Sequence, residues 1–362
     1  MAGRELDESD IRERPSRRGT RPRTKQRPAH EDALPGRVTA VDRGRYTLLL
    51  DEDGSDERVV LAMKARELGR DRVVCGDQVD VVGDTSGDEG SLARIVRIAE
   101  RRTVLRRTAD DTDPYERIVV ANADQLVIVT ALAQPEPRTG FIDRAVVAAY
   151  DAGMDVLLCL TKADLASPDV LRDLYEPIGV RVVVTRREQP DAASGASAID
   201  GVDALRAAVA GRVSVLLGHS GVGKSTLVNA LVPGTGRATG HVNDVTGRGR
   251  HTSTSAVALR LPVPDAGLPA GGRRGWVIDT PGIRSFGLAH VDVARVLSAF
   301  EDLDAVAVER CPRGCTHLAG APDCALDAWV EEAPDDATRD AREARLTSFR
   351  RLVEARAAGD RD

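Results

Sequence analysis

The residues with the clearest chemistry form a glycine-rich segment past the middle of the chain. The run Gly218-His219-Ser220-Gly221-Val222-Gly223-Lys224-Ser225, followed by Thr226, fits the pattern G-x-x-x-x-G-K-[ST]. Residues 213–217 before it predict a short buried strand, and residues 225–231 after it predict the start of a helix. In that context the glycines let backbone N–H groups surround phosphates, and the helix N-terminus adds partial positive charge. We therefore expect a nucleotide site in which Lys224 contacts the β- and γ-phosphates and Ser225 binds Mg²⁺.

A second motif follows about 55 residues after Lys224, where Asp279-Thr280-Pro281-Gly282 comes directly after a predicted strand at 276–278. A strand that ends in D-x-x-G is typical of the second switch of GTPases. We expect Asp279 to bind Mg²⁺ through water and the Gly282 N–H to sense the γ-phosphate. Such turns also occur by chance, and the spacing from Lys224 favours the functional interpretation.

The segment Thr161-Lys162-Ala163-Asp164 is similar to the guanine-reading motif NKxD, with Thr161 where Asn is usual. Asp164 can accept hydrogen bonds from the N1–H and the N2 amine of guanine, which adenine lacks in that arrangement. The alternative is a solvated turn after a strand at 156–160. In an ordinary GTPase this motif follows the phosphate loop, whereas here it precedes it. A site requires proximity in space and not chain order, so we predict an intact site with rotated connectivity.

Alternating apolar runs and helical periods surround these motifs. Strands are predicted at 125–129, 156–160, 180–184 and 213–217, with helices at 141–150, 169–176 and 201–210. Such alternation predicts a parallel sheet with helices on both faces.

The N-terminal third has a different pattern. Five short strands are predicted at 37–41, 46–50, 59–63, 78–82 and 93–98, with a hairpin signal at Asp53-Gly54. This favours a small barrel of the OB type, which often binds nucleic acid, and a plain β-domain is the alternative. Before it, residues 12–27 hold eight Arg or Lys and one acidic residue, Glu13. We expect a disordered basic tail that contacts RNA phosphates or is simply solvated; it has no apolar segment typical of a signal peptide.

Three of the five cysteines lie close together near the C-terminal end of the chain. Cys311, Cys315, His317 and Cys324 offer three thiolates and an imidazole, the ligand set of a closed structural zinc site. A disulfide plus a spare thiol is the alternative, disfavoured if the chain is cytosolic. Cys75 and Cys159 are interpreted as small packing residues.

Together these motifs resemble the circularly permuted small ribosomal subunit biogenesis GTPases over nearly the whole chain. That resemblance implies an N-terminal OB domain, a permuted α/β P-loop GTPase domain and a C-terminal zinc-binding helical domain. Gly249-Arg250-His251-Thr252-Ser253 resembles the family's first switch G-x-H-T-T, and Thr252 or Thr254 would sense the γ-phosphate. Ile283 stands where many GTPases carry a water-orienting Gln, so the resemblance implies His251 for that role; a surface-loop histidine is the alternative. Three residues separate Cys311 from Cys315 and six separate His317 from Cys324, where the family more often has four and five.

The composition agrees with this interpretation. The net charge is −6, but the tail, Arg101-Arg102 and Arg106-Arg107 concentrate positive charge locally. Aromatic residues are 3% of the chain, so we expect recognition of the phosphates and shape of structured RNA rather than base stacking. No apolar run approaches a membrane span.

We therefore expect a cytoplasmic, monomeric, Mg²⁺-dependent GTPase that hydrolyses GTP to GDP and phosphate, binds ribosomal RNA, acts in small-subunit assembly and is stimulated by that subunit. The expected divisions are a tail at 1–34, the OB domain at 35–105, the GTPase domain at 115–290 and the zinc-binding helical domain at 291–362. Two alternatives are an RNA-binding assembly module that holds nucleotide only as a structural ligand, and an ATPase.

Overall fold

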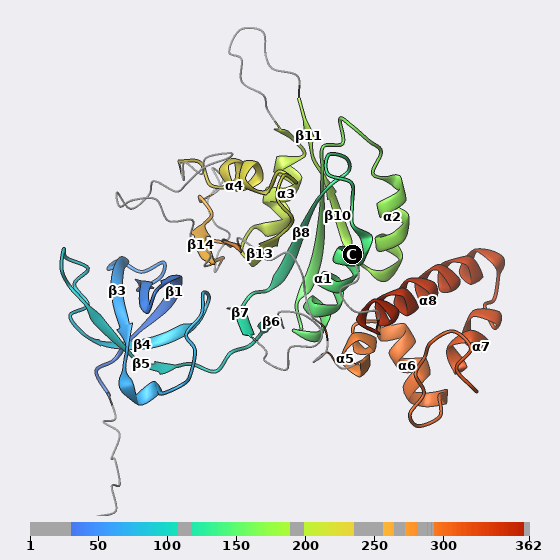
Figure 1. The fold of residues 1–362 in the computed structure, drawn as a ribbon, viewed down its shortest axis with the longest axis horizontal. Helices are drawn as coiled ribbons and strands as arrows, with labels where there is room; N and C mark the ends of the chain where they lie inside the picture. The colour runs from blue at the N-terminus through green and yellow to red at the C-terminus, as the bar shows by residue number, and fades with distance from the viewer. Residues whose placement is uncertain are drawn as a thin grey trace, which may run out of the picture. The chain divides into compact units, whose positions relative to one another are not determined.

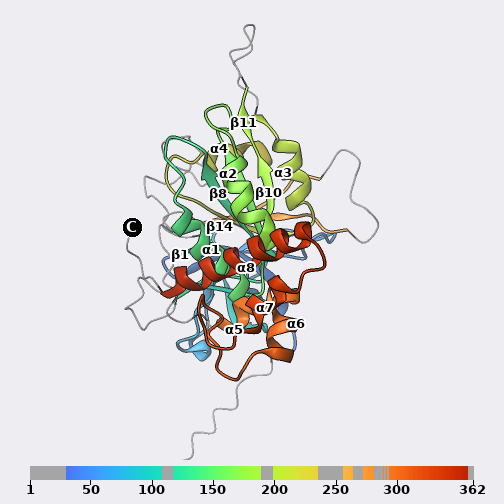
Figure 2. The same cartoon turned by 90° about the vertical axis from the view of Figure 1, so that its right-hand side faces the viewer.

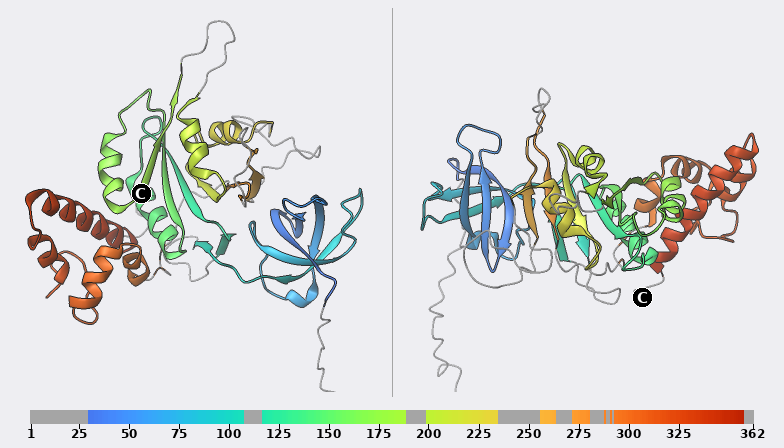
Figure 3. Two further views of the ribbon diagram at one scale, coloured as in Figure 1. Left: turned by 180° about the vertical axis from the view of Figure 1, so that it is seen from behind. Right: turned by 90° about the horizontal axis from the view of Figure 1, so that it is seen from above.

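The computed structural model describes residues 30–107, 117–188, 199–234, 256–263, 272–280, 288, 291 and 293–357. The basic tail, the first-switch residues 251–255 and residues 281–287 of the second switch lie outside these ranges. Figure 1 shows the element order, and Figures 2 and 3 give further views.

The N-terminal strands close into a five-stranded barrel. They are β1 (Leu34–Asp42), β2 (Arg45–Leu50), β3 (Arg58–Lys64), β4 (Gln78–Gly83) and β5 (Ala93–Ile98). Their order is β1-β2-β3-β5-β4, and β4 pairs again with β1 to close the barrel. Alternate residues such as Val38, Leu48, Val60, Val81 and Ile95 fill its core, as the period of two requires. A short helix, η2 (Arg66–Leu68), follows β3. All five predicted strands are confirmed, and β2 and β3 form the predicted antiparallel hairpin.

A two-stranded ribbon that the sequence analysis missed lies after the barrel. It pairs β6 (Val104–Arg107) with β7 (Arg117–Ala121), and the register shifts between Leu105 and Arg106. Each strand holds one or two buried residues, so the alternation is too short to stand out.

The central sheet contains five parallel strands in the order β10-β9-β8-β13-β15. They are β8 (Gln125–Ala131), β9 (Asp155–Thr161), β10 (Arg181–Val184), β13 (Val213–Leu217) and β15 (Trp276–Asp279). The expectation of a purely parallel sheet is corrected by β14 (Val257–Arg260), which pairs antiparallel with β15. Only one of its four residues, Ala258, is buried, and a strand this short does not stand out in the sequence.

Helices cover both faces of this sheet, as predicted. On one side are α1 (Thr139–Asp151), α2 (Asp169–Tyr175) and η3 (Glu176–Ile178), and on the other α3 (Val202–Val209) and α4 (Lys224–Leu231) (Figure 1). Leu126 and Ile128 of β8 belong to the first core, whereas Val127 and Val129 belong to the second. Beyond β10, β11 (Arg186–Arg187) pairs with β12 (Ile199–Asp200).

The C-terminal part is helical, with α5 (Val293–Ser298), α6 (Glu301–Arg310), α7 (Ala325–Glu331) and α8 (Asp336–Ala357). The sequence analysis did not identify α6, which lies between β15 and the first zinc ligand. Only Leu303 and Ala307 of α6 are buried, which gives a weak helical pattern.

The long helix α8 packs against α1 and η3 (Figure 2). At this contact, Asp143 of α1 accepts a 2.8 Å hydrogen bond from Tyr175 and lies 3.2 Å from the Arg351 guanidinium of α8. Burial raises the pKa of the Asp143 carboxyl, although Arg351 opposes this. Among the described residues, no helix is long and apolar enough to span a membrane.

Candidate nucleotide site and zinc centre

The phosphate loop connects β13 to α4, as the sequence predicts. Gly221 and Gly223 have φ values of 83° and 96°, in the left-handed region that favours glycine. A Cβ at Gly218 would lie 2.6 Å from the Val129 carbonyl oxygen, so only glycine fits beside β8. These constraints give the loop the backbone that a phosphate site requires.

Lys224, at the start of α4, joins the phosphate loop to the D-x-x-G motif. Its Nζ lies 2.9 Å from Asp279 Oδ1 and donates a 3.2 Å hydrogen bond to the Thr280 carbonyl. The Lys224 and Asp279 side chains are only 12% and 8% exposed, so solvent screens this pair poorly. The cation and the carboxylate that the sequence assigns to phosphate and magnesium therefore lie together.

The oxygen ligands present suit Mg²⁺, which takes carboxylate and phosphate oxygens with waters. Asp279 is held at the start of α4 by Lys224, and Ser225 is the next residue of that helix. The Thr280 hydroxyl donates 2.8 Å to the Leu216 carbonyl, which fixes the chain just after Asp279 to the strand before the phosphate loop. Ser225 and Asp279 are thus the residues of this site that fit magnesium, directly or through water.

The guanine motif and the phosphate loop meet through Thr161. Its hydroxyl donates a 2.6 Å hydrogen bond to the Val222 carbonyl, and Thr161 is buried at the end of β9. Lys162, which follows with a φ of 61°, donates from Nζ to the Gln134 carbonyl. The two motifs are therefore neighbours despite their reversed order.

Asp164 is exposed, and its Oδ1 accepts a 3.0 Å hydrogen bond from the Arg187 backbone N–H. The Ala163 N–H donates 3.2 Å to the Thr185 carbonyl. The segment 185–187, which the sequence analysis did not single out, thus supports the guanine motif. The sequence could have indicated this segment by its position directly after β10, the strand next to β9, since loops at the carboxyl ends of adjacent parallel strands lie together. One N–H leaves the Asp164 carboxylate able to accept further hydrogen bonds.

His219, the second residue of the phosphate loop, packs against the start of α1. Its ring centroid is 4.2 Å from that of Phe141, at an interplanar angle of 54°. Ser220 and Thr226 occupy the turn and the first turn of α4 respectively. His219 therefore also has a packing role, beyond the nucleotide contact that the motif predicts.

Several predicted residues fall outside the described part of the chain. They are His251, Thr252, Thr254, Gly282 and Ile283. The adjoining strand is described: Val257 of β14 pairs with Asp279 of β15. The chain that leaves the first-switch segment therefore runs beside the D-x-x-G motif.

The predicted metal ligands converge between α6 and α7. One ligand atom from each of Cys311, Cys315, His317 and Cys324 lies within 4.8 Å of the others. Cys324 Sγ is 4.0 Å from His317 Nδ1. Zn–S bonds of about 2.3 Å and Zn–N bonds of about 2.0 Å place tetrahedral ligand atoms a little under 4 Å apart. The four residues therefore fit zinc, and all five cysteines have free thiols, which disfavours the disulfide alternative.

Neighbouring groups support this cluster. The Ala325 N–H donates 3.4 Å to Cys311 Sγ, and Arg350 of α8 donates 3.0 Å to the His317 carbonyl while pairing with Asp327. Burial, followed by the charge of Arg350, lowers the pKa of the His317 imidazole, which favours the neutral form that binds metal. In contrast, Cys75 and Cys159 are buried apart from this cluster, and burial raises the pKa of each thiol to about 12, in keeping with packing roles.

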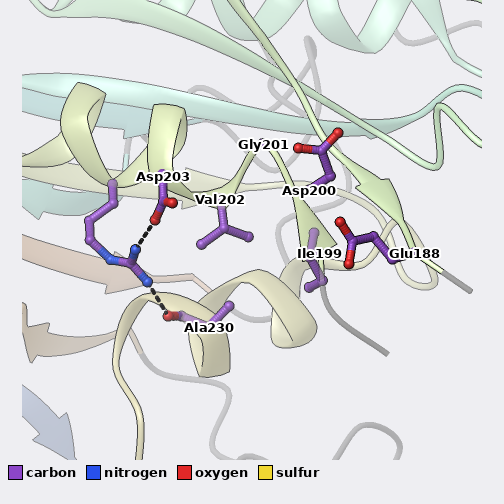
Figure 4. A pocket seen from close by; sticks show the side chains of 8 residues that line it. Glu188, Ile199, Asp200, Gly201, Val202, Asp203 and Ala230 are labelled. Carbon is purple, nitrogen blue, oxygen red and sulfur yellow. Dashed lines mark hydrogen bonds and ion pairs between the residues drawn. The ribbon is translucent and has the colours of Figure 1, made fainter. Parts of the chain in front are cut away.

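An open pocket lies elsewhere, beside α3 and the end of α4 opposite Lys224 (Figure 4). Three of its lining residues are acidic: Glu188, Asp200 and Asp203. Asp203 pairs with Arg206, which also donates to the Ala230 carbonyl. No phosphate-loop residue lines the pocket, and negative charge disfavours a nucleotide there.

Comparison with known proteins agrees with this geometry. The family model described as RsgA GTPase matches residues 98–289. The Small ribosomal subunit biogenesis GTPase RsgA of Pseudomonas aeruginosa (strain LESB58) is 40% identical over 272 residues, which cover 72% of this chain and 70% of that protein. Its namesake from Chlorobaculum parvum is 31% identical over 319 residues, 85% of this chain and 95% of that protein.

Two crystal structures share the fold. YjeQ from Thermotoga maritima aligns with a TM-score of 0.56 at 24% identity, over 89% of this chain and 99% of that one. YloQ, titled a circularly permuted GTPase, aligns with a TM-score of 0.56 at 21% identity, over 89% and 97%. The resemblance noted from the motifs is confirmed, and the chain belongs to the RsgA GTPase family.

Proposed function

We propose that this protein hydrolyses GTP to GDP and phosphate in the assembly of the small ribosomal subunit, and that the subunit stimulates hydrolysis. The observation that carries the proposal is the convergence of the permuted motifs, joined by Thr161–Val222 and Lys224–Asp279, within the segment that matches the RsgA GTPase family model. The relatives' names supply the subunit.

The phosphate loop and Lys224 would bind the β- and γ-phosphates. The Lys224 ammonium, now 2.9 Å from Asp279, would exchange part of that contact for phosphate oxygens. Ser225 and Asp279 would hold Mg²⁺, which would offset charge on the phosphate oxygens as the β–γ bond breaks. The rest of the phosphate loop would complete the phosphate side of the site, namely Gly218, His219, Ser220, Gly221, Val222, Gly223 and Thr226. Gly282 would lie at the γ-phosphate.

On the base side, Asp164 would accept hydrogen bonds from guanine N1–H and the N2 amine, while Thr161 and Lys162 shape the loop. His251 is proposed to orient the attacking water, because the apolar Ile283 cannot, and Thr252 or Thr254 would sense the γ-phosphate. Intrinsic hydrolysis would be slow, and subunit docking would accelerate it by bringing these side chains to the γ-phosphate and the attacking water.

The remaining parts would serve RNA binding. The barrel at 35–105 and the basic tail at 1–34 would contact ribosomal RNA. One structural Zn²⁺ would stabilise the C-terminal domain at 291–362, which follows the GTPase domain at 115–290. Its ligands would be Cys311, Cys315, His317 and Cys324. A monomer in the cytoplasm is the arrangement that we propose.

The experiment that tests this function is GTP hydrolysis with and without purified small ribosomal subunits. Stimulated turnover supports the proposal. Binding of GTP without hydrolysis in a single-turnover assay would support a structural nucleotide instead, and equal competition by ATP would favour an ATPase.

A further inference from the structure

The turn between β2 and β3 of the barrel is acidic, and its carboxylates contact the central sheet. Arg260 of β14 pairs with both Asp53 and Glu57, and Arg274 lies 3.8 Å from Asp53. The Arg260 hydrogen bond holds the pKa of the Glu57 carboxyl below its usual value.

Trp276 of β15 belongs to the same contact. Its Nε1–H donates a 2.7 Å hydrogen bond to Glu52 Oε1, while Glu52 Oε2 accepts 2.7 Å from Arg37 Nε of β1. The guanidinium groups of Arg37 and Arg260 lie 5.6 and 5.7 Å from the Trp276 ring centroid, within cation–π range. We call the six residues Arg37, Glu52, Asp53, Glu57, Arg260 and Trp276 the seam.

The strand register connects the seam to the switches. Arg260 pairs with Trp276 at one end of β14 and β15, and Val257 pairs with Asp279 at the other end, about 10 Å away. At that second end Ala40 of β1 pairs with Val257, so the barrel contacts β14 along its length. The chain enters β14 from the first-switch segment 251–255, and leaves β15 through the D-x-x-G motif.

The arginine of the seam is more buried than its carboxylate partners. The Arg260 side chain is 13% exposed, whereas its partners Asp53 and Glu57 are 36% and 31% exposed. A guanidinium that water reaches poorly needs carboxylate partners, and removing them leaves it uncompensated. Loss of these acidic residues would therefore loosen β14 more than loss of an ordinary surface charge.

We propose that the seam transmits engagement of the barrel to the first switch, by holding β14 in register with β1 and β15. This rests on the proposed function, since it assumes that the small subunit stimulates hydrolysis. The seam residues position the switch strand and take no part in contacting the nucleotide. A coupling free energy is reciprocal, so a change at the first switch would alter engagement of the barrel by the same free energy.

The test uses the full-length protein with Asp53→Asn and Glu57→Gln together. Replacing acids by amides makes the protein more positive, so a loss of stimulation could not be due to weaker attraction for RNA. The matched control is Asp80→Asn, a barrel carboxylate that lies 3.0 Å from Arg97 outside the seam. Arg260→Gln breaks the seam from the other side.

In the free protein, we expect amide hydrogen exchange in residues 256–260 to become at least about fivefold faster in the double variant and in Arg260→Gln, but not in the control. With subunits, we expect the stimulation factor to fall by about tenfold in both seam variants while basal hydrolysis stays within about twofold. Adding Arg260→Gln to the double variant should lower stimulation no further, because both changes break the same contact.

The outcomes separate the inference from the function. If the subunits stimulate the wild type and the double variant equally, the proposal for the seam is wrong while the proposed GTPase function stands. Unchanged exchange at 256–260 would also overturn it. A wild type that subunits do not stimulate would overturn both proposals, whereas loss of stimulation with faster exchange establishes the seam.

Discussion

The Thr161 hydroxyl donates a 2.6 Å hydrogen bond to the carbonyl of Val222 and thereby joins two motifs that lie 61 residues apart in the unusual order. A threonine in place of asparagine thus still braces the phosphate loop from the guanine motif. Gly223 lies against the same side chain, since a Cβ added at this glycine would lie 3.7 Å from Thr161 Oγ1. The permuted chain builds one site because the loops that follow β9 and β13, two parallel strands separated only by β8, lie at the same edge of the sheet.

Thr161→Val should weaken nucleotide binding. Valine has the same shape but no donor, so the Val222 carbonyl loses its partner at a cost of about 1–3 kcal/mol. Calorimetric titration with GDP should show affinity reduced by about tenfold or more, whereas Thr161→Ser, which keeps the hydroxyl, should bind nearly normally. Equal affinity of the valine variant and the wild type would show that this bond does not shape the site.

Lys224→Ala should abolish measurable GTP hydrolysis, with a loss of at least about a hundredfold. Among the described residues no other lysine is part of the phosphate loop, and the variant also leaves the Asp279 carboxylate without its 2.9 Å cation. The matched control is Lys64→Ala on the barrel, whose Nζ donates only to nearby carbonyls. Turnover of Lys224→Ala within about threefold of the control would refute the phosphate-loop assignment.

Asp164→Asn should shift base preference from guanine towards xanthine. An amide oxygen can still accept from the Arg187 N–H, so the loop is kept, but the amide nitrogen now donates where guanine also donates. Competition between GTP, XTP and ATP measures the change, with Asp169→Asn at the exposed start of α2 as the control. If the variant keeps its preference for GTP over ATP and XTP, Asp164 does not read the base.

The protein should contain about one Zn²⁺ per chain when purified without chelator. Cys324→Ser should lose the metal and lower the thermal stability, since the cluster connects α6, α7 and, through Arg350, α8. Elemental analysis with a thermal melt measures both effects, and Cys75→Ala should keep the zinc. Wild-type protein free of zinc would contradict the assignment.

Much of the fold could be predicted because its signals are local. The barrel strands alternate over five or more residues, and the strands of the parallel sheet are short apolar runs between helical periods. The ribbon β6–β7, the strand β14 and the helix α6 escaped because few of their residues are buried. Leu303 and Ala307, for example, are the only buried residues of α6.

The candidate site could be predicted as residues but not as contacts. Glycine and lysine spacing identifies the phosphate loop, and ligand types identify the zinc cluster. That Lys224 pairs with Asp279, that the Arg187 N–H supports Asp164, and that Arg260 binds the acidic turn depend on strand order and register. Such long-range pairings leave no periodicity in a single sequence.

The most direct test of the central claim is the rate of GTP hydrolysis by the wild type with and without purified small ribosomal subunits, measured beside His251→Ala. We predict slow intrinsic turnover, stimulation by the subunits of about a hundredfold or more, and loss of most of this stimulation in His251→Ala, because His251 is proposed to orient the attacking water. His241→Ala, ten residues earlier in the chain and outside the first-switch motif, should stay stimulated. Equal wild-type rates with and without subunits would contradict the account.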